Sequence, residues 1–580
     1  MILQPPHVIA QTQLMNGQSR QAFKTAKAAM ARHPKNALLP NVAALALCAQ
    51  GKPREAVALF QKAIQIDPGF ADAQRNLAQT LVLLNMADKA LVLLQRLIRQ
   101  QPQDEGAQYL CAQALSQLGR IEEAEAAAGR AITLAPRLAR NFNLRGLLRN
   151  GLGLTDAALA DFEAALALDP NNVETLVNIS LPLARLTRHD EALSMAQRAV
   201  QLAPNHIGAH LRLAETWVEA GQSAEARAEY HAVLRLDPQN AEAIEQLANL
   251  QSREENDALQ AIARAALKRA PAQSPERAGL NFALARIAQQ AGDSDGEARH
   301  LAEANREMAR ALPYDAAADN ALTDRIIGYF PLSPAAAAAE EMTPIYVLGL
   351  PRSGTTLAEA ILASHPAVKG LGEQIAAGRA LMPLIEAGDP IGPEALEQFR
   401  QTEQRLHPPL PEGCRAFVDK MPENYRLLGF LLAAHPGARI IHLTRDPRDV
   451  ALSMWRGRFA GSALNYTYDL KAMAHRFNLY ARLMAFWHAE FPGRILDLSY
   501  EEMTGDVEAA SRRLAEFCGL DWVPAMARPN ETQAAVLTMS ATQLRQPVHR
   551  QSVGKWRAQA ETLAPFIAGL DPTLWPEISE

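Results

Sequence analysis

Small apolar residues recur every 34 positions along roughly the first 240 residues of the chain. One line of alanines comprises Ala22, Ala56, Ala90, Ala124, Ala158, Ala192 and Ala226. A second line of small residues, twelve positions earlier, comprises Ala10, Ala44, Ala78, Ala112, Gly146, Ser180 and Ala214. Prolines follow each alanine of the first line by twelve positions, at Pro34, Pro68, Pro102, Pro136, Pro170, Pro204 and Pro238. A fixed spacing of this kind indicates a repeated structural unit.

The residues between these lines predict a helix–turn–helix in each unit. Turn residues stand between the two lines of small residues, at Gly17, Gly51, Asn85, Gly119, Gly153, Thr187 and Gly221. Gly and Asn tolerate a left-handed backbone and end a first helix. Proline cannot continue a helix, so it closes the second. The pattern resembles the tetratricopeptide repeat and predicts an all-α repeat superhelix. A generic alanine-rich bundle is the alternative.

The repeat pattern weakens after Pro238, and a different kind of sequence begins near residue 344. We predict repeats over residues 3–312, seven of them regular and residues 241–312 degenerate. A connecting segment, 313–343, follows, and its apolar residues Ile326, Ile327, Tyr329 and Phe330 predict that it packs against the next domain. Residues 344–580 form that domain.

The second domain opens with a strand, a glycine-bearing loop and a helix. The apolar run Pro344–Leu348 precedes GLPRSGTT at residues 349–356. Backbone N–H groups of such a loop and the helix N-terminus converge on an anion. The two glycines have Walker A spacing, but Thr355 replaces the Lys that a nucleoside triphosphatase uses. The loop therefore argues against ATP or GTP hydrolysis, with an ordinary strand–helix turn and a kinase-like P-loop enzyme as alternatives.

A second buried strand, Ala438–Leu443, runs into the motif RDPRDVALS at residues 445–453. Arg445 at the strand end and Ser453 on the next helix can clamp one phosphate between them. Together, the two motifs of residues 344–560 resemble the sulfotransferase family. The resemblance implies an α/β P-loop-type domain with a parallel sheet, and transfer of a sulfuryl group from 3′-phosphoadenosine 5′-phosphosulfate (PAPS).

The resemblance assigns donor contacts residue by residue. The 5′-phosphosulfate would be held by Arg352, Ser353, Gly354, Thr355 and Thr356. Arg445 and Ser453 would hold the 3′-phosphate. Lys420 stands where the family places a Lys near the bridging oxygen, where a cation stabilises charge on the departing phosphate. A surface Lys is the alternative reading of that position.

Glu373 matches the general base of the tyrosylprotein branch of the family. That branch carries two adjacent Glu residues, whereas Gln374 follows here, and its substrate-gripping Arg is absent. Glu373 corresponds to the first or to the second of these Glu residues, depending on whether one residue is inserted when the two sequences are aligned. Tyrosine as the acceptor stays open for the same reason.

A late segment, QSVGKW at residues 551–556, resembles the loop that closes over the nucleotide. The resemblance gives Ser552 and Lys555 phosphate contacts, with a solvated basic face as the alternative. Tyr500 matches a position beside the nucleotide, where a core tyrosine is the alternative.

Composition narrows the class of protein further. The formal net charge of −5 gives no reason to propose nucleic acid as a partner. The four cysteines are scattered and predict reduced core thiols. The histidines show no metal-ligand spacing, so no metal site is expected. Without a signal peptide or a run of roughly 18 apolar residues, we expect a cytoplasmic protein without a membrane span.

These observations predict a PAPS-dependent sulfotransferase acting on a hydroxyl or phenol, including protein tyrosine. Seven or more stacked repeats offer a long curved surface on which we expect a protein or peptide acceptor to bind. Alternatively, the repeats only form a homodimer or solubilise the enzyme. A repeat-based scaffold with a vestigial transferase domain is the alternative function.

Overall fold

The computed structural model describes residues 4–186, 188–332, 342–407, 410–459, 461, 463–531 and 548–579. The chain divides into two compact units, Met1–Leu186 and Thr187–Glu580. The first unit is built from helices alone within its described part. The second combines helices with one parallel β-sheet.

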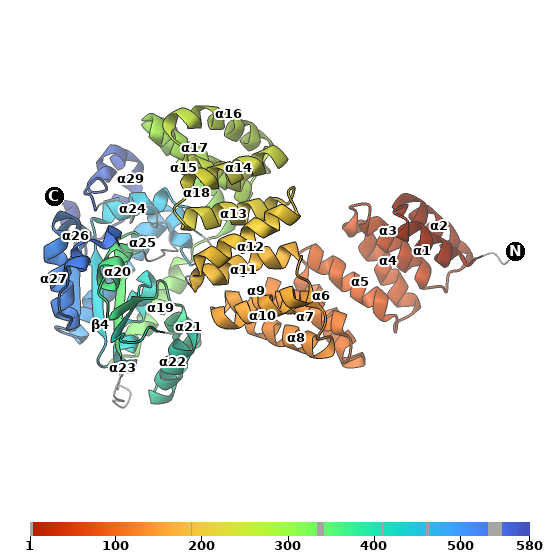
Figure 1. The fold of residues 1–580 in the computed structure, drawn as a ribbon, viewed down its shortest axis with the longest axis horizontal. Coiled ribbons are helices and arrows are strands. Elements are labelled where there is room, and N and C mark those ends of the chain that lie inside the picture. Colours follow the sequence, from red (N-terminus) through yellow and green to blue (C-terminus); the bar gives the residue numbers. More distant parts are fainter. Residues whose placement is uncertain are drawn as a thin grey trace. The chain divides into compact units, whose positions relative to one another are not determined.

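Consecutive helices of the first unit pack against each other along the chain, as the red-to-orange part of Figure 1 shows. These helices are α1 (Pro6–Met15), α2 (Ser19–Arg32), α3 (Leu38–Cys48), α4 (Pro53–Ile66), α5 (Ala71–Leu83), α6 (Ala87–Gln100), α7 (Glu105–Gln117), α8 (Ile121–Leu134), α9 (Ala139–Gly151), α10 (Thr155–Leu168) and α11 (Val173–Arg185). The prediction of an all-α helical array is confirmed.

The repeat features have the physical roles that their spacing indicates. Gly17, Gly51 and Asn85 have positive φ values of 75°, 75° and 56° at the turn between paired helices. Ala22 and Ala56 are fully buried where the helices meet. At Gly146, a Cβ atom would lie 2.8 Å from the ring of Phe162, so only glycine permits this approach. The turn residue Thr187 lies outside the described residues.

The second unit also begins with a series of helices. Its helices are α12 (His189–Leu202), α13 (Ile207–Glu219), α14 (Ser223–Leu236), α15 (Ala241–Leu250), α16 (Arg253–Arg269), α17 (Pro275–Ala291), α18 (Ser294–Ala311) and α19 (Ala316–Gly328). Gly292, which follows the last residue of α17, has a φ of +78°. The glycine turn of the regular repeats therefore also occurs in the degenerate region.

A five-stranded parallel sheet follows in the order β2-β3-β1-β4-β5. Its strands are β1 (Thr343–Gly349), β2 (Val368–Gly370), β3 (Ala416–Asp419), β4 (Arg439–Thr444) and β5 (Ile495–Ser499). Alternate residues of β1 serve opposite faces: Ile345 and Val347 belong to one hydrophobic cluster, and Tyr346 and Leu348 to another. The sheet is thus buried on both faces, as parallel sheets are.

Helices cover both faces of this sheet, within the green-to-blue part of Figure 1. The cluster of Ile345 and Val347 includes residues of α20 and α27, and that of Tyr346 includes residues of α23, α25 and α29. The remaining elements are α20 (Thr355–Ala363), α21 (Ala376–Ala387), α22 (Pro393–Leu406), η1 (Pro422–Arg426), α23 (Leu428–Ala434), α24 (Pro447–Trp455), η2 (Asn465–Tyr468), α25 (Leu470–Glu490), α26 (Tyr500–Gly505), α27 (Val507–Cys518), η3 (Pro524–Ala527), η4 (Pro529–Glu531), η5 (Lys555–Gln559), α29 (Ala560–Ile567) and η6 (Pro576–Ser579).

Helices α17 and α18 share one hydrophobic core with the sheet domain. Phe282, Leu301 and Met308 lie in the same cluster as Tyr346 and Trp487. The segment after α18 joins this core as well. Ile326 is fully buried there, and the ring centroid of Phe330 lies 4.8 Å from that of Trp487 in an edge-on arrangement. The last helix pair is therefore built into the sheet domain.

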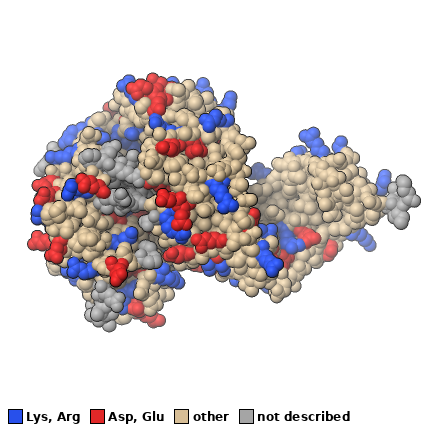
Figure 2. All heavy atoms as spheres, in the orientation of Figure 1, with Lys and Arg blue, Asp and Glu red and all other residues tan. Residues whose placement is uncertain are grey.

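Charged side chains of both signs are interspersed over the face of the molecule drawn in Figure 2. The composition agrees, with 58 Lys and Arg against 63 Asp and Glu. Among the described residues, no helix has both the length and the apolar character that a membrane span requires.

Candidate active site

The carboxyl ends of the five parallel strands carry most of the predicted site residues. In sheet order, the strands lead to Glu373, Lys420, the loop 350–354, Arg445 and Tyr500. The crossover from β1 runs toward β2, whereas the crossover from β4 runs the other way to β5. Ligands of open parallel sheets bind in the crevice that such a reversal leaves at the strand ends. The crevice between the loops after β1 and β4 is the candidate site.

The loop after β1 folds into a turn that only these residues accommodate. Gly349 has φ +147°, and a Cβ atom there would lie 2.4 Å from the carbonyl oxygen of Leu443. Gly354 has φ +103°, and a Cβ atom would lie 2.6 Å from the ring of Tyr500. Arg352 adopts a left-handed φ of +72°, a conformation that costs free energy outside glycine. Strain concentrated in one short loop is typical of a functional site.

Helix α20 begins directly after this loop, with Gly354 at its N-cap and no side-chain cap. Thr355 and Thr356 form its first turn and are 4% and 9% exposed. The N-terminal amides of a helix carry partial positive charge and attract anions. The structure therefore has the strand, glycine-bearing loop and helix that the sequence predicts in this order.

Arg352, Ser453 and Arg445 come together from two loops and a helix. The Nε of Arg352 donates to the Oγ of Ser453 at 3.0 Å. The Nη1 of Arg445 donates to the carbonyl oxygen of Arg352 at 3.0 Å. The guanidinium of Arg445 also lies 4.5 Å from the ring centroid of Tyr500. Four predicted residues therefore meet in one cluster.

This cluster is electrostatically prepared for an anion. Burial lowers the pKa of Arg352, and the neighbouring Arg445 guanidinium lowers it further. Within the described part of the chain, the buried hydroxyl of Ser353 and the Nε of Arg445 have no hydrogen-bond partner. Buried polar atoms are normally satisfied, so unpartnered atoms on this loop and on Arg445 indicate a place for a ligand.

Lys420 and Glu373 form a close ion pair on the β3 side of the site. The Nζ of Lys420 lies 2.7 Å from the Oε1 of Glu373. The Lys420 side chain is 1% exposed, which excludes the surface alternative, while that of Glu373 is 47% exposed. The backbone N–H of Lys420 donates to the carbonyl of Gly372 at 2.9 Å and fixes the two segments in register. A buried cation thus lies beside an accessible carboxylate.

Glu359 on α20 completes this arrangement, and the sequence did not reveal it. Its Oε1 accepts the backbone N–H of Gly372 at 2.6 Å, which holds the turn that carries Glu373. Burial raises the pKa of Glu359, and the Lys420 ammonium and the Gly372 hydrogen bond partly offset that rise. The sequence feature that could have identified Glu359 is an acidic residue one turn after the start of the helix that follows the glycine-bearing loop.

The late loop (residues 550–559) is held by Arg445, which follows β4, and by Asp449 of α24. The Nη2 of Arg445 donates to the carbonyl oxygen of Ser552 at 2.7 Å. The carboxylate of Asp449 accepts the N–H groups of Gly554 at 2.6 Å and Trp556 at 2.9 Å. The loop therefore brings Ser552 and Lys555 to the cluster. Asp449 lies inside the predicted motif, but its role depends on a contact more than 100 residues away.

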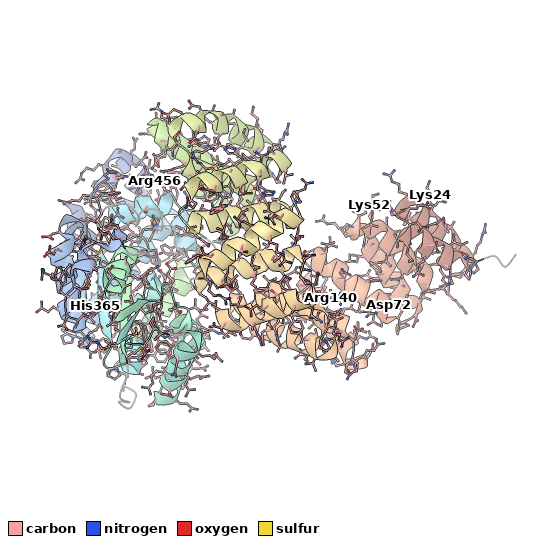
Figure 3. The ribbon with its side chains drawn as sticks, viewed as in Figure 1. Lys24, Lys52, Asp72, Arg140, His365 and Arg456 are labelled. Carbon is pink, nitrogen blue, oxygen red and sulfur yellow. The ribbon has the colours of Figure 1, made fainter. Side chains whose placement is uncertain are left out.

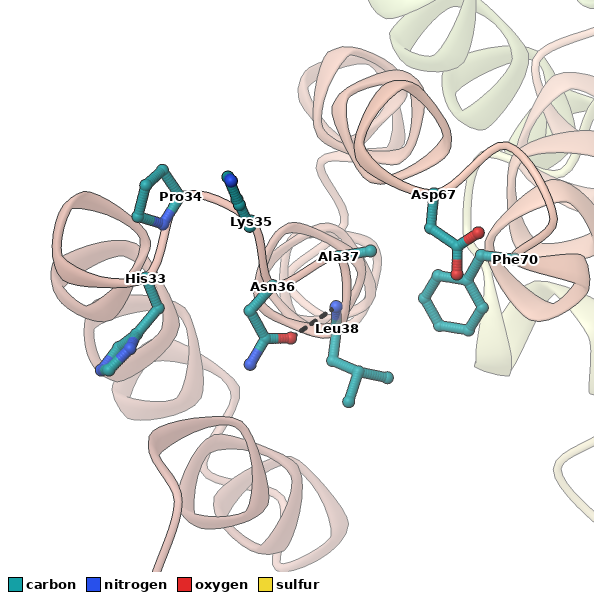
Figure 4. A pocket seen from close by; sticks show the side chains of 8 residues that line it. All are labelled: His33, Pro34, Lys35, Asn36, Ala37, Leu38, Asp67 and Phe70. Atoms are coloured by element: carbon teal, nitrogen blue, oxygen red, sulfur yellow. Dashed lines mark hydrogen bonds between the residues drawn. The ribbon is translucent and has the colours of Figure 1, made fainter.

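Two further features lie apart from this cluster. His442, Asp497 and His488 place one potential ligand atom each within 4.8 Å. The Nδ1 of His442 and the Oδ1 of Asp497 lie 2.6 Å apart, so these side chains form a hydrogen-bonded pair in the structure. In the repeats, a pocket of about 760 Å³ is lined by His33, Pro34, Lys35, Asn36, Ala37, Leu38, Asp67 and Phe70. Figure 4 draws these side chains.

Two kinds of known family match separate parts of the chain. Residues 344–524 match the model of the sulfotransferase family. Tetratricopeptide repeat models match residues 8–69, 47–110, 106–138, 143–207 and 183–250. The chain therefore carries a sulfotransferase-family domain after an array of tetratricopeptide repeats.

Similar proteins come from distant organisms. A protein of Aquifex aeolicus is 28% identical over 390 residues, which cover 62% of this chain and 50% of that protein. Protein-tyrosine sulfotransferase 2 of Gallus gallus is 26% identical over 244 residues, covering 38% and 64%. Protein-tyrosine sulfotransferase 1 of Danio rerio is 26% identical over 268 residues, covering 40% and 74%. The chain thus spans about half the length of the Aquifex relative.

Among solved structures, a thermophilic tetratricopeptide-repeat protein of Thermus thermophilus is 27% identical, with a TM-score of 0.29. The match covers 31% of this chain and 97% of that protein.

Proposed function

We propose that this protein transfers a sulfuryl group from PAPS to a hydroxyl or phenol acceptor. The loop 350–354, Thr355 and Thr356 would hold the 5′-phosphosulfate. Arg445 and Ser453 would hold the 3′-phosphate. Ser552 and Lys555 would contact the phosphates of the nucleotide, and Tyr500 would lie beside it. The proposed domain division remains repeats over residues 3–312, a connection over 313–343 and a transferase domain over 344–580.

In the proposed reaction, the acceptor oxygen attacks sulfur in line with the sulfur–oxygen bond that breaks. The acceptor's proton passes to the carboxylate of Glu373, and 3′-phosphoadenosine 5′-phosphate departs. Positive charge from Arg352 and Lys420 would stabilise the charge that builds on the departing phosphate. Because Glu373 is half-exposed and Lys420 is buried, the base faces the side from which an acceptor can arrive.

One observation carries the proposal: Arg352 and Arg445 converge with Ser453 at the strand ends, beside unpartnered buried polar atoms of the same cluster. A vestigial domain that only scaffolds other proteins has no need of buried cations beside a strained loop, since both cost stability. The match to the sulfotransferase family supports the same reaction class. The relatives named protein-tyrosine sulfotransferase favour a phenolic acceptor, including protein tyrosine.

We further propose that the repeats recruit a polypeptide acceptor. Tetratricopeptide arrays present extended surfaces that bind protein segments. Holding the acceptor on the same chain raises its effective concentration at the active site.

Calorimetric titration of the purified protein with PAPS, 3′-phosphoadenosine 5′-phosphate and ATP tests the donor assignment. We expect both 3′-phosphorylated nucleotides to bind much more tightly than ATP. Radiolabelled sulfate transfer from PAPS to a small phenol then tests the reaction. Tighter binding of ATP, or no transfer to any acceptor, would overturn the proposal.

Arg445→Ala tests the assignment of the 3′-phosphate. Losing a buried, charge-assisted contact costs about 1.5–3 kcal/mol. PAPS binding should weaken by that amount, whereas adenosine 5′-phosphosulfate, which lacks the 3′-phosphate, should lose less. Equal losses for the two ligands would show that Arg445 does not contact the 3′-phosphate.

A further inference from the structure

A buried carboxylate of the helical array contacts two segments of the transferase domain. Glu297 lies in the first turn of α18 and is 4% exposed. Its Oε1 accepts the Nε of Arg456 at 2.6 Å, and its Oε2 accepts the Nε2 of Gln559 at 3.2 Å. Gln289 of α17 also donates to Oε1, at 3.2 Å. One side chain therefore joins α17 and α18 to two separate segments of the transferase domain.

The first of these segments is the end of α24, the helix that carries Asp449 and Ser453. Arg456 follows this helix directly and is labelled in Figure 3. Asn305, a fully buried residue of α18, donates to the carbonyl oxygen of Trp455 at 2.9 Å. Helix α18 thus holds the carboxyl end of α24 through two residues.

The second segment is the late loop. Three groups hold it: Arg445 at Ser552, Asp449 at Gly554 and Trp556, and Glu297 at Gln559. The first two belong to the transferase domain, and the third comes from the helical array. Lys555 lies between Gly554 and Trp556, the two residues that Asp449 holds. It also begins η5, the short helix that ends at Gln559, so the Glu297 contact holds the other end of the same element.

The surroundings of Lys555 are strongly cationic. Burial lowers the pKa of Lys555, and Arg456, Arg286 and Arg445 lower it further, while Asp449 acts in the opposite sense. Arg286 belongs to α17, and its pKa is lowered by burial and by Arg456. Like charges repel each other, so this group of cations stays in place only while its anchors hold it.

We propose that Glu297 is a positioning residue of the donor site: it fixes the late loop and the end of α24, so that Lys555 and Ser453 meet the phosphates of the donor. The helical array would then be part of the transferase site as well as a binding surface. This inference rests on the proposed donor assignment.

Glu297→Gln in the full-length protein tests the proposal, with 3′-phosphoadenosine 5′-phosphate as the calorimetric probe. We expect its Kd to rise about tenfold or more, a change of about 1.4 kcal/mol. In assays, the KM for PAPS should rise similarly, while kcat at saturating PAPS stays within about threefold, since Glu297 touches no reacting atom. Gln559→Ala should change the Kd in the same direction, because it removes only the contact to the late loop.

Two control variants separate positioning from general stability. Glu303→Gln changes an exposed carboxylate of α18 that pairs with Arg306, and we expect no change in Kd. Glu245→Gln removes a buried carboxylate of α15 that pairs with Arg458 at 2.8 Å, and it should lower the Tm without changing the Kd. If Glu245→Gln and Glu297→Gln weaken binding equally, the effect is general destabilisation and the proposal is wrong.

A double-mutant cycle shows whether Glu297 acts through the late loop. If it does, the losses of Glu297→Gln and Lys555→Ala should be less than additive. Additive losses, or an unchanged Kd in folded Glu297→Gln and Gln559→Ala, would overturn the inference. Failure of the wild-type protein to bind the bisphosphate would instead overturn the proposed function.

Discussion

In the proposed reaction, a buried cation and an accessible carboxylate at the strand ends have separate roles. Lys420 is enclosed and supplies fixed positive charge, whereas Glu373 is half-exposed and hydrogen-bonds to Lys420 with one oxygen. A general base must reach the acceptor proton, so exposure suits Glu373 to that role. A charge-stabilising group acts most strongly where water is excluded, which suits Lys420.

Glu373→Gln should leave donor binding intact and remove most turnover. General-base catalysis typically contributes about 10²–10⁴-fold, and glutamine cannot accept the proton. Sulfate-transfer rates and calorimetric donor affinity measured on the same preparation check this, with the exposed Glu394→Gln as a matched control. Near-normal turnover with a good acceptor would remove Glu373 from the mechanism.

Burial has a large effect on the pKa of one carboxyl group of the transferase domain, that of Asp419. Burial raises its pKa well above the ordinary value, Glu403 adds to the rise, and hydrogen bonds from Gln374 and Asn424 offset part of it. The folded protein therefore binds this proton more tightly than the unfolded chain does. Stability from this group is fully present below the unfolded pKa near 3.8 and is lost as the pH rises through the folded pKa.

Asp419→Asn removes that titration. The free energy of unfolding of the variant should increase relative to wild type as the pH rises from 4 toward 7, by at most about 1.4 kcal/mol per pH unit. Urea unfolding at several pH values measures the difference. A difference that stays constant, or that moves in favour of wild type, would contradict the assignment of a raised pKa.

At the level of helices and strands, local patterns predicted most of what surrounds the donor site. The apolar run 344–348 is β1, the run 438–443 is β4, and the helix after the glycine loop is α20. These elements are recognisable because their periodicity and their glycines are properties of neighbouring residues. The same holds for the turn glycines of the repeats, whose positive φ values follow from their place in each unit.

The contacts that complete the site could not be predicted in this way. Strand β2 has only three residues, too few for a pattern, yet it places Glu373 beside Lys420. Asp449 and Glu297 hold the late loop across 105 and 262 residues of sequence. Such pairs depend on how whole elements pack, and a buried carboxylate has the same local signature as a solvated one. The sequence therefore identified the two proposed donor-binding motifs but not the residues that hold them in position.

For the molecule as a whole, the hydrophobic core of the sheet domain extends into the helical array, upstream of the proposed boundary at residue 344. Helices α17 and α18 contribute Ala278, Phe282, Ala285, Leu301, Ala304 and Met308 to the core of the sheet domain. Burial of a side chain such as Phe, Leu or Met contributes about 1.5–3 kcal/mol. Exposing three of these side chains would cost about 5–9 kcal/mol, which is comparable with the whole net stability of a domain, roughly 5–15 kcal/mol. The compact unit of residues 187–580 keeps all of these contacts.

Two fragments test this boundary and the role of the remaining repeats together. Residues 187–580 should fold cooperatively and transfer sulfate to a small phenol at the full-length rate, because the fragment retains α17, α18 and Glu297. Residues 314–580 should aggregate or melt at a much lower temperature.

The longer fragment also tests the role of residues 1–186. If these residues recruit the acceptor, the fragment 187–580 should no longer label the polypeptides of a cell extract that the full chain labels with radioactive sulfate. Unchanged labelling of both the small phenol and the polypeptides would show that residues 1–186 have no recruiting role. A well-folded 314–580 fragment would show that the transferase domain does not need α17 and α18 to fold.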